Sequence, residues 1–196
     1  NYSYDDRYLF QANYRQDKSS LFGEKNNKVD AYSFSGAWKI SNEKFIHLPE
    51  YISNIKLRGS WGRLGNNPIA PYSFATTVNR FAGYDFNNAL ANGTTVISSI
   101  DPDLRWETSE SSDVALELGF FNNDLQFTAE YFNKKSDDLL VNVPLPFSTG
   151  AFPAQILTNG AAMNNSGYEF SLAYNNSHHE FKYNISANVG TLKNEV

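Results

Sequence analysis

Cysteine is absent from the 196 residues of the sequence. This excludes a disulfide framework, a thiolate zinc site and a cysteine nucleophile. No uninterrupted apolar run approaches the about 18 residues of a membrane helix, and Asn1 opens directly into strand-like sequence without a signal peptide. We expect any targeting segment to lie outside these residues.

Clustered positive charge is also missing. The 16 Lys and Arg residues are scattered among 21 Asp and Glu residues, and the net charge is -5. Nucleic-acid affinity comes mostly from clustered cations that contact phosphates. We therefore expect no nucleic acid among the partners.

Helical periodicity is nearly absent, whereas alternation of apolar and polar residues recurs along the whole chain. With 41% hydrophobic residues, the chain can bury a sizeable core. The alternation predicts an all-β fold of about eight antiparallel, up-and-down strands. They lie at 7–15, 32–40, 55–61, 107–121, 124–133, 138–144, 166–175 and 180–190, and the segment 138–144 is weakened by Pro144 and Pro146.

Asn122 and Asn123 predict a two-residue hairpin turn, because Asn tolerates the positive φ that such turns require. The register set by this turn places apolar residues opposite one another throughout one face. The predicted pairs on this face are Phe120 with Leu125, Leu118 with Phe127, Leu116 with Ala129 and Val114 with Tyr131. The opposite face gathers Ala115, Glu117, Gly119, Gln126, Thr128 and Glu130.

A second hairpin is predicted from Tyr174 opposite Phe181, which brings Leu172 to Tyr183 and so on along the strands. Tight turns at 122–123 and 176–179 alternate with long connections, and the segment 41–54 is intermediate in length. The long connections are 16–30, 64–106 and 134–165. This asymmetry is typical of an outer-membrane β-barrel with long extracellular loops, and structureless loops of this length are uncommon in soluble domains.

Five stretches of the chain resemble, in family order, the barrel region of SusC/RagA-type TonB-dependent outer-membrane transporters. They are "NYSYDDRYLFQANYRQDKSSLFGEKNNK" at 1–28, "SFSGAWKISNEKF" at 33–45, "ISNIKLRGSWGRLGNN" at 52–67, "DPDLRWETSESSDVALELGFFNNDLQFTAEYFNKKSDDLLVNVPLP" at 101–146 and "GAAMNNSGYEFSL" at 160–172. The resemblance implies that residues 1–196 are part of one barrel domain of about 22 strands. A plug domain, a signal peptide and the C-terminal end of the barrel have no counterpart here.

The resemblance also implies a function. Such transporters import oligosaccharides or peptides across the outer membrane of Gram-negative bacteria, with a SusD-like lipoprotein on the outside and the TonB complex acting through the plug. In this interpretation one face contacts lipid and the other lines the lumen. The lipid-facing residues are then Leu116, Leu118, Phe120, Leu125 and Phe127, and the lumen-facing residues are Glu117, Gln126, Thr128 and Glu130. The alternative is a soluble β-sandwich, an adhesin or carbohydrate-binding module, with the apolar set in its core.

Candidate substrate contacts lie in the long connection 64–106, where aromatic rings accompany a guanidinium. Rings stack on sugars and the guanidinium can bond hydroxyl groups, although packing of the loop against itself is the more common use of such residues. The candidates are Arg80, Phe81, Tyr84 and Phe86.

Enzyme and metal chemistry find weaker support. Glu117 and Glu130 share a face, as the carboxylates of glycosidases do, but nothing nearby predicts that their pKa values differ. Asp101 and Asp103 lack the pattern of a calcium loop, and Pro102 favours a structural turn. His178 and His179 fit a solvated turn, and "GRLGNN" lacks the lysine of a phosphate-binding loop. We therefore expect no catalytic residue, no metal and no cofactor.

Overall fold

The chain folds into strands joined by turns. The computed structural model describes residues 1–196 except 72, 74, 76–77, 97–99, 151–153 and 177–179, and it does not describe the side chains of 79–82, 95 and 96. The strands are β1 (Tyr2–Tyr4), β2 (Tyr8–Lys18), β3 (Lys28–Lys39), β4 (Ile52–Asn66), β5 (Val78–Phe86), β6 (Ala89–Val96), β7 (Glu107–Phe120), β8 (Leu125–Pro144), β9 (Gln155–Asn176), β10 (Tyr183–Gly190) and β11 (Lys193–Glu195). Two single-turn 3₁₀ helices, η1 (Ile40–Asn42) and η2 (Phe147–Thr149), complete the described elements.

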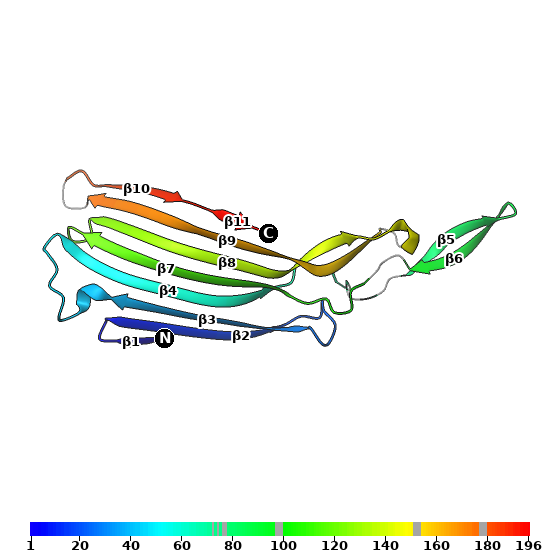
Figure 1. The fold of residues 1–196 in the computed structure, drawn as a ribbon, viewed down its shortest axis with the longest axis horizontal. Helices are drawn as coiled ribbons and strands as arrows, with labels where there is room; N and C mark the ends of the chain where they lie inside the picture. Colours follow the sequence, from blue (N-terminus) through cyan, green and yellow to red (C-terminus); the bar gives the residue numbers. More distant parts are fainter. Residues whose placement is uncertain (72, 74, 76–77, 97–99, 151–153, 177–179) are drawn as a thin grey trace.

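One large sheet dominates the fold. Its strand order is β1-β2-β3-β4-β7-β8-β9-β10, and β11 pairs with β9 beyond the end of β10. Every pair of neighbours is antiparallel. The strands of this sheet form one curved layer with two open edges (Figure 1). This confirms the predicted all-β, up-and-down arrangement as an open part of a barrel wall.

The connections alternate between the two ends of the sheet. The short turns β7–β8 and β1–β2 lie at one end, together with the β3–β4 segment, and the longer connections lie at the other (Figure 1). No helix among the described residues is long or apolar enough to span a membrane.

The strands extend further into the predicted loops than alternation alone indicated. The 16–30 and 134–165 loops shrink to 19–27 and 145–154, because β2, β3, β8 and β9 continue toward the loop end. The predicted strand 138–144 is therefore not separate: it is the outer part of β8. An irregularity between Ser136 and Leu140 interrupts its pairing with β9 and its alternation, and Pro144 occupies the last strand position.

The β7–β8 hairpin confirms the predicted register. Phe120 pairs with Leu125 and Leu118 with Phe127, and the ladder continues without slippage to Thr108 and Asp137. Asn122 and Asn123 both have positive φ, 56° and 68°. The turn chemistry and the apolar pattern therefore agree on one alignment.

The β9–β10 hairpin has a different register from the one predicted. Ile185, not Phe181, lies opposite Tyr174, and Leu172 pairs with Ala187 instead of Tyr183. The shift is four residues, so each side chain keeps its face. The strand β10 starts at Tyr183, which makes the turn longer than the predicted 176–179, and His178 and His179 lie outside the described residues.

The 64–106 connection contains a hairpin that the analysis of the sequence missed. Strands β5 and β6 pair with each other alone and project beyond the loop end of the large sheet (Figure 1). Asn87 and Asn88 form its turn with φ values of 52° and 62°. The same Asn-Asn dipeptide marks the turn at 122–123, and it was the signal available in the sequence.

The best-buried apolar cluster lies at the loop end, not within the sheet. Phe22 and Trp106 stack with ring centroids 5.2 Å apart, and Leu104 completes the cluster at 2% exposure. Leu140 of β8 and Leu157 of β9 support it from the extended strands. The segment "DPDLRWE" therefore has the structural role expected of it, because it pins the 19–27 and 101–106 connections to the sheet.

We expect Leu104→Ala to loosen this cluster without unfolding the sheet. Removing a buried leucine side chain costs about 2–5 kcal/mol where the site cannot collapse. Hydrogen exchange of amides 101–106 in the detergent-folded full-length protein should accelerate accordingly. Leu192→Ala is the control because Leu192 is 69% exposed, and unchanged exchange in Leu104→Ala would show that the cluster does not hold these connections.

Candidate functional site

The two faces of the large sheet differ sharply in chemistry. Continuous register carries one apolar face across neighbouring strands, and many of its large side chains are exposed. Its members include Tyr8, Phe10, Phe34, Leu57, Val114, Leu116, Tyr131, Tyr168, Phe170, Leu172, Ile185 and Val189. The opposite face carries ion pairs and hollows. Functional groups of the wall are therefore concentrated on this polar face.

The predicted lipid-facing set lies together on the apolar face. Leu116, Leu118, Phe120, Leu125 and Phe127 fall on one side of β7 and β8 by their pairing. Neighbouring strands extend this side, since Leu57 pairs with Leu116 and Leu172 with Phe127. In the part of the chain that the structure describes, no second sheet covers these residues. A soluble β-sandwich needs such a layer, so the geometry does not support that alternative.

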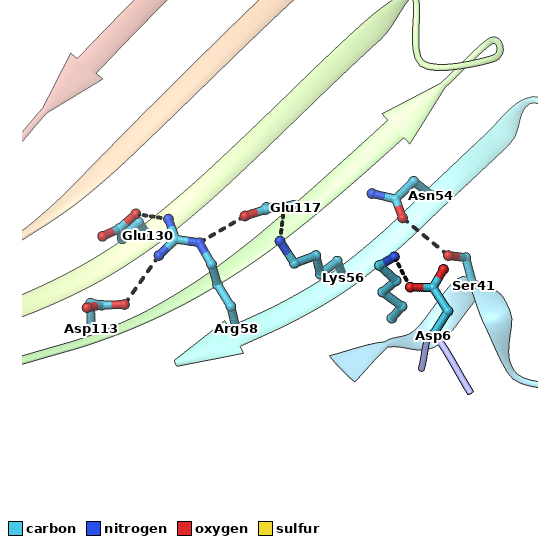
Figure 2. A network of polar contacts seen from close by, with 9 residues as sticks. Asp6, Ser41, Asn54, Lys56, Arg58, Asp113, Glu117 and Glu130 are labelled. Carbon is cyan, nitrogen blue, oxygen red and sulfur yellow. Dashed lines mark hydrogen bonds and ion pairs between the residues drawn. The ribbon is translucent and has the colours of Figure 1, made fainter. Parts of the chain in front are cut away.

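The predicted lumen-facing set lies together on the polar face. Glu117 pairs with Thr128, and Glu130 and Gln126 occupy the same side of β8. Arg58 of β4, which sequence reasoning did not single out, joins two of these residues. Its Nε donates to Glu117 Oε1 at 2.8 Å and its Nη2 to Glu130 Oε2 at 2.5 Å (Figure 2). Arg58 is thus the centre of the site.

A third carboxylate completes the arrangement around Arg58. Its Nη1 donates to Asp113 Oδ2 at 3.3 Å, and the Ser60 hydroxyl donates to the other oxygen of Asp113. Lys56 Nζ donates to Glu117 Oε2 at 3.1 Å (Figure 2). The three carboxylates exceed the two cations by one negative charge, and every charged group has a partner.

Register explains how one guanidinium reaches two neighbouring strands. Arg58 pairs with Ala115 of β7, and Ala115 pairs with Glu130 of β8. Because only a methyl group separates them, the arginine side chain can lie across β7, and Ala115 is 1% exposed. Glu117 and Asp113 flank Ala115 by two residues on the same face.

The polar face is hollowed along its length. A hollow of about 430 Å³ near the tight turns is lined by Lys39, Glu117, Gln126 and Thr128, among others. A second of about 400 Å³ reaches Arg58 and Asp113, and a third of about 870 Å³ lies toward the loop end. The three hollows are open and are spread along one wall, whereas a small-molecule site is more often one concave pocket.

Glu117 and Glu130 do not have the arrangement of an acid and a base. Both accept hydrogen bonds from the same guanidinium, so the surroundings of the two carboxylates are alike. Glycoside hydrolysis needs two carboxyl environments that differ. The geometry assigns these residues to an ion-pair network.

Tyr84 and Phe86, two of the candidate substrate contacts, lie away from the polar face. Their rings are 4.8 Å apart on the β5–β6 hairpin, and both are more than half exposed. Arg80 and Phe81 belong to β5, but their side chains lie outside the described residues. Substrate contact by this set stays a prediction.

A second polar cluster, also missed, anchors the β3–β4 connection. Glu43 is 5% exposed and accepts hydrogen bonds from Tyr8 Oη at 2.6 Å, Trp38 Nε1 at 2.9 Å and Arg7 Nη1 at 3.1 Å. Bonding to Tyr8, then to Trp38 and Arg7, lowers the pKa of Glu43. Arg7 and Tyr8 lie 36 and 35 residues from Glu43 along the chain, so no local motif predicts the cluster.

Comparison with known proteins places this geometry in a family. The profile described as "TonB dependent receptor-like, beta-barrel" matches residues 1–195. The chain belongs to this family. The family is one of transporters.

Relatives match the chain along its whole length. TonB-dependent receptor P26 of Formosa agariphila is 37% identical over 198 residues, and TonB-dependent receptor SusC of Bacteroides thetaiotaomicron is 31% identical over 201 residues. In each case all of this chain aligns with 20% of the relative. The chain therefore spans about a fifth of the length of these relatives.

A solved structure shares the fold. One chain of the RagAB peptide transporter is 28% identical and superimposes with a TM-score of 0.82, covering 98% of this chain and 21% of that one. The RagAB peptide importer in the "open-open" state gives a TM-score of 0.83. The corresponding segment of those longer chains has a similar fold.

We expect Arg58→Gln to destabilise the wall by about 1–3 kcal/mol. The substitution leaves three facing carboxylates, and partial exposure of the network moderates the cost. The change in unfolding temperature of the full-length protein in detergent measures it. Arg15→Gln is the matched control, because the Arg15–Asp17 pair is exposed. Equal effects of the two substitutions would contradict a special role for Arg58.

Glu43 predicts an acid-dependent loss of stability. A lowered pKa means that the stabilisation is complete above the ordinary pKa of 4.5 and is lost as pH falls through the lower folded-state value. Glu43→Gln should therefore lower the unfolding temperature at neutral pH, and its difference from the wild type should shrink at steps below pH 4.5. A difference that stays constant with pH would show that Glu43 does not titrate with folding.

Proposed function

We propose that residues 1–196 form an interior part of the barrel wall of an outer-membrane transporter. In this proposal the longer protein imports oligosaccharides or peptides in a TonB-dependent manner in a Gram-negative bacterium. The supporting observation is a single sheet with an uncovered apolar face and a charged face, in a chain that belongs to the TonB-dependent receptor family.

The two faces have distinct roles in this proposal. Leu116, Leu118, Phe120, Leu125 and Phe127 contact lipid, because in hydrocarbon an apolar surface carries no penalty and the strands satisfy their backbone hydrogen bonds with each other. The lumen is lined by the face that carries Glu117, Gln126, Thr128 and Glu130. Because Arg58 forms ion pairs with these carboxylates, charged groups can line a water-filled passage with a small desolvation penalty.

Partners follow from the relatives. The similarity to SusC and to the RagAB peptide transporter supports a SusD-like surface lipoprotein as the external partner. Because RagAB is a peptide transporter, peptides are candidate substrates beside oligosaccharides. The TonB complex would act through a plug domain outside these residues. The exposed Tyr84–Phe86 pair at the loop end is our candidate contact for the substrate or the lipoprotein.

Cysteine labelling tests the orientation, since the segment has no cysteine of its own. Phe127→Cys and Thr128→Cys are adjacent and lie on opposite faces of β8. In outer membranes that carry the full-length protein, a bilayer-soluble maleimide should label position 127 and a small water-soluble maleimide position 128. The reverse pattern would overturn the assignment of faces.

Uptake tests the transport function. A strain that lacks the full-length gene should lose accumulation of labelled peptides or labelled oligosaccharides, and a strain that lacks TonB should show the same loss. Restoring the gene should restore uptake in the presence of TonB alone. Undiminished uptake of both substrate classes without the gene would contradict the proposal.

A further inference from the structure

The apolar face ends at its loop side in a row of charged residues. Successive pairs link Tyr32 of β3 to Arg63 of β4, Arg63 to Glu110 of β7, and Glu110 to Lys135 of β8. The row continues through Lys135 and Asn164 of β9. Two cations, Arg63 and Lys135, therefore lie in one row of paired residues on the face that we assign to lipid.

Side-chain contacts confirm that this row shares the apolar face. The Trp61 ring lies 5.4 Å from that of Tyr32, and Trp61 Nε1 donates to Glu110 Oε1 at 2.9 Å. Tyr131 is four residues before Lys135 on β8, and its ring is tilted against that of Tyr168 with centroids 5.1 Å apart. The exposed aromatic rings thus end directly beside the charges, as they do where a barrel leaves the hydrocarbon for the headgroup region.

The two cations of the row are available to a ligand. Arg63 is exposed, and its side chain has no hydrogen-bond or ion-pair partner among the residues that the structure describes. Lys135 contacts Asp137 at 3.0 Å, but its side chain is 58% exposed. Glu110, which lies between them, is held by Trp61. Two strand spacings separate the cations, about 10 Å.

We propose that Arg63 and Lys135 bind phosphate groups of lipid headgroups in the outer leaflet. The inference rests on the proposed function, which places the apolar face in lipid and the long connections outside. A guanidinium matches phosphate oxygens with two parallel hydrogen bonds, and a lysine adds a point charge. At the edge of an apolar band such side chains reach the headgroups while their stems stay in contact with hydrocarbon. The row thereby sets how deep the wall sits.

Lipid binding to the delipidated full-length protein in detergent tests the site. The probe is dioleoyl phosphatidic acid, with dioleoylglycerol as the ligand that has the same chains and no phosphate, and native mass spectrometry counts retained lipid. Arg63→Gln and Lys135→Gln should each weaken retention of phosphatidic acid about 5-fold. Lys134→Gln is the matched control, because Lys134 is exposed on the opposite face of β8.

The outcomes are separable. The headgroup site is overturned if retention of phosphatidic acid is unchanged in both variants or is reduced equally in Lys134→Gln. It is also overturned if inorganic phosphate at equal molar concentration displaces phosphatidic acid. If position 127 still reacts with the bilayer-soluble maleimide in that case, the proposed orientation survives without the site. If position 127 labels from water, the proposed orientation itself has failed.

Discussion

The alternation of side chains along paired strands is the constraint on which this structure depends. Each strand satisfies its backbone hydrogen bonds with its neighbours, so a single layer can leave both faces uncovered. Register then decides everything else, because it aligns apolar residues with apolar residues and charges with charges. The Leu57–Leu116–Ala129–Phe170 line on one face and the Arg58–Ala115–Glu130 line on the other follow from the same pairing.

Much of the wall could be predicted from the sequence where two independent signals agreed. In the β7–β8 hairpin, Asn122-Asn123 and the apolar pattern select the same register. The β9–β10 hairpin has no such agreement, because its Asn175-Asn176 dipeptide lies within β9 and not in the turn. Its strands are apolar at alternate positions for a long stretch, so a shift of four residues leaves the pattern intact and only the turn can decide between the alignments. The face of each residue was predictable there, but its partner was not.

The parts that could not be predicted depend on contacts between distant segments. Arg58 meets carboxylates 55, 59 and 72 residues away, and finding them requires the register of three strands at once. In the β5–β6 hairpin, β6 has mostly small residues, and its Asn92-Gly93 dipeptide competes as a turn signal with Asn87-Asn88, where the turn forms. Nothing in the sequence around Arg63, Glu110 or Lys135 distinguishes these residues, and only the strand pairing shows that they lie in one row.

The methyl group of Ala115 imposes a limit on size. Ala115 is 1% exposed, and the guanidinium of Arg58 crosses β7 above it to reach Glu130. Any bulkier residue would fill that path and separate the arginine from β8. A position with no charge of its own therefore controls the ion pair between β4 and β8, because the pair exists only while residue 115 stays small.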